Sequence, residues 1–311
     1  MSDRSVRAIA IGVERDPGAI TACRTPRRSH WSTSVAQKVA WTSAGPAKSS
    51  SGVSVPSLST IVLRRYGPTL SDVDTSNKTI TCVGVDRPTV TIDIFSDVVC
   101  PWCYIGKRRF EAGLADATAD DDLGVDFKIV FKPYQLDPTA APGVAGPVID
   151  AYAKKFGGPE KADQIISHVT RTAAEEGLEF HMERSLRANT LLAHRLIWWA
   201  AQPDTPVTQD EMKERLLHAY FMDGTHVGDA AALADCAADI GADHDEVLSF
   251  LEGSCGTAEV AAELEHARDN GITAVPTYVF DGQWAVPGAQ DAATFTKVLR
   301  RMAERALANT E

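Results

Sequence analysis

The sequence predicts an α/β fold in which a β-α-β opening leads into a long all-helical insertion, followed by a β-hairpin and a last helix. Three observations support this prediction. Residues 89–95 and 125–131 alternate in the manner of strands and enclose a segment with helical spacing. Residues 147–270 show only helical patterns, and strand signals return at 277–286, ahead of an amphipathic helix.

The opening begins with TVTIDIF at residues 89–95, where β-branched and polar residues alternate as in a half-buried strand. A helix is expected over residues 100–114, because Ile105 and Phe110 belong to an apolar series at helical spacing. VDFKIVF at 125–131 alternates again. This β-α-β order favours a parallel pair of strands joined by a right-handed crossover.

In the insertion, glycine and proline residues separate a series of helical patterns between Pro147 and Asn270. Asp243 followed by Glu246 is a capping-box pattern that marks the start of one helix. Asn270-Gly271 is typical of a helix end. We therefore expect several short helices in this part of the chain.

Strand signals return at residues 277–280 and 283–286. Asp281-Gly282 joins the two segments, and residues that accept positive φ at both positions favour a two-residue hairpin turn. A last amphipathic helix is predicted over residues 291–307.

This order of elements is thioredoxin-like, with the helical insertion between the second and third strands. We expect one domain over residues 89–311. Its core would comprise residues 89–140 and 271–311, and residues 141–270 would form the insertion. Residues 1–88 are expected to be a leader outside this domain.

The leader differs from the rest of the chain in its charge. Residues 1–90 hold 12 basic against 6 acidic side chains, and no Asp or Glu occurs from Pro17 to Ser71. No regular period persists there, so we expect it to be disordered or a non-native extension. Its basic, Ser-rich composition also fits a transit peptide, but the apolar core of a secretory signal is missing.

Composition excludes several functional classes. The 311 residues are 44% hydrophobic and 23% charged, and no apolar run approaches the roughly 20 residues that span a bilayer. A net charge of -11 argues against nucleic-acid binding. Six cysteines are too few for a disulfide-built scaffold. Without a secretory signal, we expect a cytoplasmic protein that binds neither membrane nor nucleic acid.

Cys100-Pro101-Trp102-Cys103 lies where the first strand gives way to the first helix. The first turn of a helix offers unpaired N–H groups and the positive end of the macrodipole, and both favour a thiolate at Cys100. Pro101 is tolerated at a helix start because its missing N–H has no acceptor there. We expect Cys100 to be the nucleophile, and Cys103 to be the less exposed thiol that resolves a mixed disulfide. Trp102 would cover the motif.

Two other readings of this motif stay open. A C-x-x-C pair can supply half of a zinc site, but the sequence holds no second such pair and no H-x-x-x-H. A plain structural disulfide is disfavoured by the position between strand and helix. We therefore expect redox chemistry and no bound metal.

Val275-Pro276 lies directly before the third predicted strand. A proline can begin a strand without special meaning. With a C-x-x-C upstream, we expect a cis peptide bond here, with Pro276 facing the dithiol. The backbone N–H and C=O of Val275 would then be available to an extended substrate.

Four segments together resemble the DsbA-type thioredoxin-fold family in its cytoplasmic FrnE-like branch: SDVVCPWCYIGKRRFE (96–111), NTLLAHRL (189–196), AYFMDGTHVGD (219–229) and GITAVPTYVFDGQWAVPGAQ (271–290). The resemblance covers about residues 90–305. It implies a protein-disulfide oxidoreductase or isomerase with Cys100 and Cys103 as the redox pair and Pro276 as the cis-proline.

The same superfamily includes 2-hydroxychromene-2-carboxylate isomerases and kappa-class glutathione transferases, which share the helical insertion and the asparagine-threonine segment. Those relatives typically carry Ser at the first cysteine position and use glutathione. Both Cys100 and Cys103 are present here, which favours redox chemistry.

Asn189 and His194 are candidate substrate-binding residues, together with Pro101, Trp102 and Val275 of the two motifs above. His194 and its neighbour Arg195 could bind a carboxylate or glutathione. A polar face on an otherwise buried helix explains them as well, and Asn189-Thr190 could simply be its N-cap.

Two further groups have a functional and a bland interpretation. Lys107, Arg108 and Arg109 could stabilise a thiolate, but a solvated helix face is the commoner explanation. Cys236 and Cys255 could form a second exchangeable pair, although buried thiols on apolar helix faces are the default.

The sequence thus favours a thiol-disulfide oxidoreductase or isomerase that exchanges disulfides with protein or small thiol substrates, requires no cofactor, and uses glutathione at most as a co-substrate. A glutathione-dependent isomerase or polyketide-biosynthesis enzyme is the first alternative, and a redox-regulated chaperone or binding module the second. The sequence leaves the oligomeric state and the direction of electron flow open.

Overall fold

The computed structural model describes residues 87–119 and 123–310 of the chain. The predicted leader, apart from its last two residues, lies outside the described residues. The described part begins with β1 (Thr89–Ser96), whose Val90, Ile92 and Ile94 side chains are buried as the alternating pattern predicts.

A four-stranded sheet in the order β2-β1-β5-β6 forms the centre of the fold. β2 (Asp126–Pro133) runs parallel to β1, as the β-α-β pattern predicts. β5 (Thr277–Phe280) is antiparallel to β1, and β6 (Trp284–Pro287) is antiparallel to β5. The predicted hairpin is confirmed, with φ of 49° at Asp281 and 66° at Gly282.

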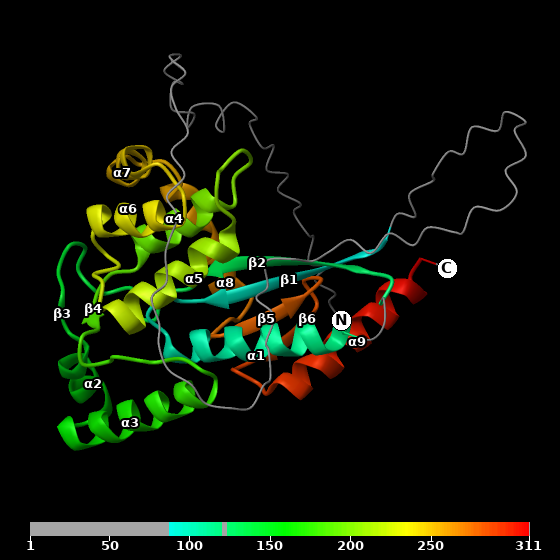
Figure 1. Ribbon diagram of the computed structural model, residues 1–311, viewed down its shortest axis with the longest axis horizontal. Helices are drawn as coiled ribbons and strands as arrows, with labels where there is room; N and C mark the ends of the chain where they lie inside the picture. The colour runs from blue at the N-terminus through cyan, green and yellow to red at the C-terminus, as the bar shows by residue number, and fades with distance from the viewer. Residues whose placement is uncertain (1–86, 120–122, 311) are drawn as a thin grey trace, which may run out of the picture. The chain divides into compact units, whose positions relative to one another are not determined.

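The helices α1 (Pro101–Thr118) and α9 (Ala292–Ala308) pack against each other beside the sheet, apart from the helices α4–α8 (Figure 1). They meet at Gly113, where a Cβ atom would lie 2.6 Å from Phe295 Cβ. Phe110, Tyr278 and Phe295 form an aromatic cluster between these helices and the sheet, with ring centroids 4.6–5.4 Å apart.

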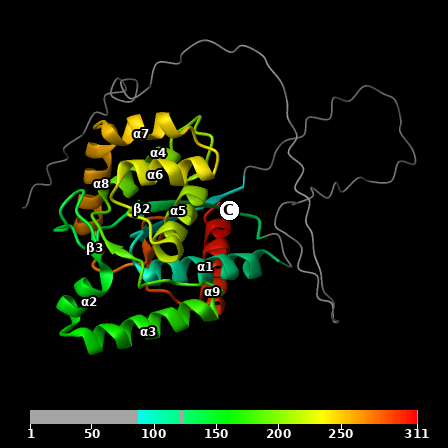
Figure 2. The same ribbon diagram turned by 60° about the vertical axis from the view of Figure 1, so that its left-hand side comes forward.

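The insertion between β2 and β5 contains most of the helices and lies in two groups, α2–α3 and α4–α8 (Figure 2). The elements are α2 (Val148–Phe156), α3 (Pro159–Glu175), α4 (Leu191–Ala200), α5 (Gln209–His218), the π-helical turn η2 (Ala219–Asp223), α6 (Ala230–Asp239), α7 (His244–Glu252) and α8 (Thr257–Asp269). Both α5 and α8 contact β2.

The expectation of an all-helical insertion is wrong in one detail. β3 (Gly146–Pro147) pairs antiparallel with β4 (Leu186–Arg187). These two-residue strands arise because the connections before α2 and α4 run side by side and satisfy each other's backbone groups. A strand of two residues has too short an alternation to leave a sequence pattern.

Helix caps explain several boundaries. Asp243 accepts a hydrogen bond from Glu246 N at 2.9 Å, which confirms the predicted start of α7. Asn270 ends α8, also as predicted. Thr208 and Glu211 form a complete capping box at the start of α5, which the sequence analysis overlooked.

Candidate active site

The dithiol lies at the first turn of α1. Cys100 is the N-cap residue with extended backbone, Pro101 follows at the first helical positions, and the Cys103 N–H donates to the Cys100 carbonyl at 3.0 Å. Both cysteines are free thiols, and each is 3% exposed. The expectation that Cys103 is the less exposed of the two is therefore wrong, because the chain around Val275 covers Cys100.

The Val275-Pro276 peptide bond is cis, as predicted. The Cys100 Sγ lies 3.7 Å from the Val275 carbonyl oxygen, so the cis-proline turn faces the dithiol. At Gly106, one turn beyond Cys103, a Cβ atom would lie 3.0 Å from Pro276 Cγ. A glycine at this position therefore lets α1 approach the turn.

The residues between the two cysteines differ in exposure. Pro101 is buried, whereas Trp102 is 36% exposed and its ring centroid lies 6.0 Å from that of His168 on α3. Trp102 therefore borders the dithiol on the side of α3. Contact of Pro101, Trp102 and Val275 with a substrate stays a prediction.

Burial dominates the electrostatics of the dithiol. It raises the pKa of Cys103 well above its ordinary value, and a hydrogen bond with Cys100 adds to this effect. Lys213 on α5 and the Asp97 backbone act in the opposite direction. Tyr152 on α2 has a pKa raised to about 12 by burial and by the charge of Cys100. Tyr152 thus lies near the first cysteine.

Asp97 lies beneath the dithiol and is completely buried. Its Oδ2 accepts the Leu136 N–H at 2.8 Å, and its Oδ1 lies 3.2 Å from His194 Nε2. That nitrogen is also 3.0 Å from the Tyr134 carbonyl oxygen. Because both neighbours are acceptors, we assign a proton to His194 Nε2.

The other predicted substrate-binding residues make contacts within the protein, His194 buried and Asn189 half-buried. His194 is buried against Asp97, as described above. Asn189 donates to the Ala140 carbonyl at 2.8 Å and accepts the Leu191 N–H at 2.9 Å, so its side chain caps α4. Contact of His194 or Asn189 with a substrate stays a prediction.

Arg195 has a structural role, and the idea that it binds a substrate carboxylate is wrong. Its guanidinium is buried and donates five hydrogen bonds, all to backbone carbonyls at and beyond the end of α7: those of Phe250, Leu251, Gly253 and Cys255. These carbonyls occupy the donors that a carboxylate would need.

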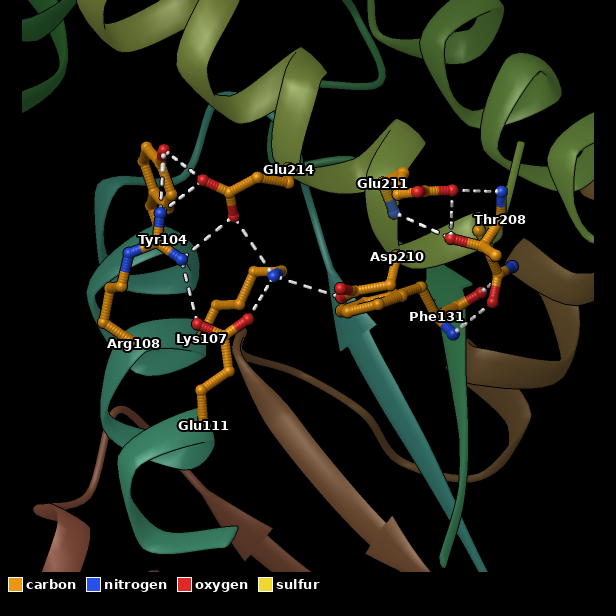
Figure 3. A network of polar contacts seen from close by, with 10 residues as sticks. Tyr104, Lys107, Arg108, Glu111, Phe131, Thr208, Asp210, Glu211 and Glu214 are labelled. Atoms are coloured by element: carbon orange, nitrogen blue, oxygen red, sulfur yellow. Dashed lines mark hydrogen bonds and ion pairs between the residues drawn. The ribbon is translucent and has the colours of Figure 1, made fainter. Parts of the chain in front are cut away.

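The solvated-face interpretation of the basic run after the dithiol is also wrong. Lys107 is buried and forms ion pairs with Glu111, Asp210 and Glu214 (Figure 3). Arg108 binds Glu111 and Glu214 as well. The acidic residues of α5 thus neutralise this face of α1 in place of water.

Glu214 occupies the centre of this network. Burial alone would raise its pKa, but Lys107 and the hydrogen bonds from Arg108 and Tyr104 outweigh it and lower the pKa of Glu214 below its ordinary value. The Tyr104 hydroxyl donates to Glu214 Oε1 at 2.7 Å. The network therefore joins the helix of the dithiol to the insertion.

The second candidate thiol pair is not formed. Cys236 is a free, buried thiol on α6, so no disulfide links it to Cys255. The default interpretation of Cys236 as a small buried side chain on an apolar helix face is confirmed.

Asp97 and Lys213 are the residues near the dithiol that the sequence analysis missed. Asp97 precedes Cys100 by three residues, so its nearness to the motif was the one available signal. Lys213 lies over a hundred residues away in a helix rich in charged residues. Its burial depends on tertiary packing and leaves no local signal.

The described residues offer neither a cluster of metal ligands nor a helix that could cross a membrane. Among residues 87–119 and 123–310, no group of three or more His, Cys, Asp or Glu side chains is arranged to hold a metal ion. Within the same part of the chain, every helix is too short or too polar to cross a membrane.

A mixed four-stranded sheet, a dithiol at the start of α1 and a facing cis-proline define a thioredoxin-like protein with a helical insertion. Residues 91–300 match the family model of the DSBA-like thioredoxin domain. The chain therefore belongs to the DsbA-like thioredoxin family, and the expected fold is confirmed.

Known proteins agree with this assignment. The structure is similar to that of the probable DsbA oxidoreductase SCO1869 from Streptomyces coelicolor, with 30% identity over 68% of this chain and 89% of that chain and a TM-score of 0.62. The uncharacterized protein YwbO from Bacillus subtilis is 28% identical over 68% of this chain and 96% of its own length. A 2-hydroxychromene-2-carboxylate isomerase shares the fold, with 14% identity over 71% of this chain and 99% of that chain and a TM-score of 0.50.

Proposed function

We propose that this protein is a thiol-disulfide oxidoreductase that exchanges disulfides through Cys100 and Cys103. The observation that carries the proposal is a pair of free thiols one helical turn apart, with the Cys100 Sγ 3.7 Å from the Val275 carbonyl oxygen at the cis-proline turn. This arrangement holds the nucleophile beside a backbone that can pair with an extended substrate.

The reaction has two displacements. The Cys100 thiolate attacks a substrate disulfide, forms a mixed disulfide and releases one substrate sulfur as a thiolate. Cys103 then attacks Cys100 Sγ, which forms the Cys100–Cys103 disulfide and releases the second substrate sulfur. The reverse sequence oxidises a substrate dithiol, and no metal or nucleotide takes part.

The substrates in this proposal are protein or small-molecule disulfides and thiols. Trp102 supplies an exposed apolar surface next to Cys100, and the Val275 backbone supplies polar groups, a combination suited to a peptide. In the cytosol, the location that the sequence favours, glutathione would return the Cys100–Cys103 disulfide to the dithiol. The reducing environment there favours reduction or isomerisation over net oxidation.

A trapping experiment tests the proposal. Cys103→Ser leaves the nucleophile but removes the resolving thiol, so we expect stable mixed disulfides with scrambled ribonuclease or oxidised glutathione, visible by mass spectrometry under non-reducing conditions. Cys100→Ser should form none. The assignment would be refuted if the wild-type protein did not reduce insulin disulfides and the Cys103→Ser variant formed no mixed disulfides.

The same Cys100→Ser variant addresses the glutathione-dependent isomerase as second candidate, which rests on the fold shared with the 2-hydroxychromene-2-carboxylate isomerase. An isomerase of that kind would keep its activity with a serine at this position, whereas disulfide exchange would be lost. Retained turnover of a hydroxychromene substrate by Cys100→Ser would favour the isomerase.

A further inference from the structure

The connection that follows β2 is bonded to the segment that leads into the dithiol. The Leu136 N–H donates to Asp97 Oδ2 at 2.8 Å, and the Tyr134 carbonyl oxygen lies 3.0 Å from His194 Nε2 and accepts its proton. The Asp97 carbonyl in turn accepts the Cys100 N–H at 3.3 Å. The backbone of Tyr134 is therefore fixed relative to the first cysteine.

The side chain of Tyr134 reaches from this connection to the cis-proline turn. Its hydroxyl donates to the Thr273 carbonyl at 3.2 Å, across 139 positions of the chain. Thr273 lies two residues before Val275, whose carbonyl oxygen is 3.7 Å from Cys100 Sγ. These contacts and those of the connection close a ring that begins and ends at Cys100.

The cis-proline turn is anchored at both of its ends. The Ile272 N–H donates to a carbonyl in the last turn of α8 at 3.0 Å, and the Pro276 carbonyl accepts the Gly288 N–H at 2.8 Å. Between these anchors, Thr273 and Ala274 are exposed to solvent. The middle of the turn therefore depends on contacts made by its own carbonyl groups.

Tyr134 supplies the contact that ties the middle of the turn to the rest of the fold. The Ala274 carbonyl accepts the Thr277 hydroxyl at 2.8 Å, but this bond is local and moves with the turn. Within the described part of the chain, Tyr134 and Cys100 are the residues of other elements that bond to positions 273–275. Loss of the Tyr134 hydroxyl would leave this stretch free to move relative to the thiol.

The turn keeps free backbone donors for a substrate. Within the described residues, the N–H groups of Thr273, Ala274 and Val275 donate to no acceptor. An extended peptide can pair with such groups in the manner of an added strand. The pairing requires that Val275 and Cys100 stay at the spacing of the peptide backbone and its cysteine sulfur. A small disulfide has no backbone to pair and does not depend on this spacing.

We propose that Tyr134 is a positioning residue for peptide substrates. Its hydroxyl holds the turn at Thr273, so that Val275 pairs with the substrate backbone while the substrate sulfur meets Cys100. This inference rests on the proposed disulfide exchange, and it names extended peptide disulfides as the substrate class that depends on Tyr134.

Two mixed disulfides with the same leaving group separate backbone pairing from thiol reactivity. One joins nitrothiobenzoate to the cysteine of a short unstructured peptide, and the other joins it to mercaptoethanol. In both, the Cys100 thiolate bonds to the aliphatic sulfur as the sulfur–sulfur bond breaks, and nitrothiobenzoate leaves as a coloured thiolate. With Cys103→Ser as the parent protein, each reaction stops at the mixed disulfide.

The rate of colour release against peptide concentration gives a half-saturating concentration and a maximal rate. When Tyr134→Phe is added to the parent, we expect the half-saturating concentration to rise about 3- to 10-fold, the range for one neutral hydrogen bond, with an unchanged maximal rate. The mercaptoethanol reaction should proceed as in the parent. Equal slowing of both reactions, a change confined to the maximal rate, or no change with the peptide refutes the positioning role.

Two controls define the effect. Thr118→Val removes another exposed hydroxyl, one that donates to the Leu114 carbonyl at 2.9 Å near the end of α1, and should leave both reactions unchanged. A peptide with methylated amide nitrogens on both sides of its cysteine lacks the donors for pairing, so Tyr134→Phe should no longer differ from the parent with this substrate. A peptide-specific loss in Thr118→Val, or an undiminished loss with the methylated peptide, would overturn the proposal.

Failure of the proposed function itself looks different. Addition of Cys100→Ser to the parent gives the blank for both substrates. A parent that releases coloured thiolate no faster than this blank would refute disulfide exchange through Cys100. If the parent reacts with both substrates above the blank, exchange stands, and the comparison with Tyr134→Phe decides the role of Tyr134 alone.

Discussion

Replacement of Arg195 should destabilise the protein strongly while leaving its chemistry intact. Arg195 is 4% exposed, and its guanidinium donates to four backbone carbonyls at 2.7–3.0 Å. The contacts with Phe250 and Leu251 are buried, so in Arg195→Met these two carbonyls lose their donors without gaining water. At about 1.5 kcal/mol for each hydrogen bond to a charged group, the loss is about 3 kcal/mol.

Urea denaturation followed by tryptophan fluorescence measures this loss. Arg195→Lys should recover only part of it, because an ammonium lacks the planar fork that reaches several carbonyls at once. Arg301→Met is the matched control, since Arg301 is 71% exposed with a single ion pair to Glu304, and it should change stability by less than about 0.5 kcal/mol.

Two results would contradict the structural role of Arg195. One is a loss below about 1 kcal/mol in Arg195→Met. The other is a folded variant of normal stability with impaired disulfide exchange, which would return Arg195 to the substrate-binding role that the sequence left open.

Three further predictions concern packing and charge. Gly113→Ala would place a Cβ 2.6 Å from Phe295 Cβ and 2.7 Å from the Ala292 carbonyl oxygen, so we expect a net loss of about 1–2 kcal/mol in urea denaturation despite the better helix propensity of alanine. A more stable variant would show that α1 and α9 separate readily. Tyr278→Phe removes a buried hydroxyl that has no hydrogen-bond partner in the described part of the chain. The variant should be more stable by about 1 kcal/mol, seen as a higher melting temperature. A clearly lower melting temperature would show that the Tyr278 hydroxyl does have a hydrogen-bond partner. The pKa of Glu214 is lowered on folding, so its contribution to stability is present above its ordinary value of 4.5 and is lost as pH falls below it. Glu214→Gln should therefore be less stable than wild type at neutral pH, and its stability should fall less steeply as the pH drops below 4.5. A variant whose stability declines in acid as steeply as that of wild type would contradict the network.

The sequence predicted those parts of the fold whose signals are local. Alternation located β1 and β2, Asp281-Gly282 located the hairpin, and the residue types at the start of α1 located the dithiol. In each case neighbouring residues along the chain determine the backbone conformation, so a short window of sequence contains the information.

The surroundings of the dithiol could not be predicted in this way. Lys213 and Asp97 are buried by elements distant in sequence, and nothing in their own segments distinguishes them from solvated charges. The interpretation of Lys107 as a solvated charge was wrong for the same reason, because two of its three acidic partners, Asp210 and Glu214, come from the distant helix α5. The equal exposure of Cys100 and Cys103 likewise depends on the turn at Val275, far along the chain.

The ion pairs between α1 and α5 have a consequence for the order in which the protein is made. Arg108 and Glu214 are separated by 106 positions, so during translation the cationic side of α1 leaves the ribosome long before its counter-charges are synthesised. A shortened protein that joined residues 89–140 directly to 271–311 would keep both thiols and the cis-proline but would leave Lys107 with Glu111 as its sole remaining partner from this network. The insertion is thus an integral part of the unit that holds the dithiol rather than a removable accessory.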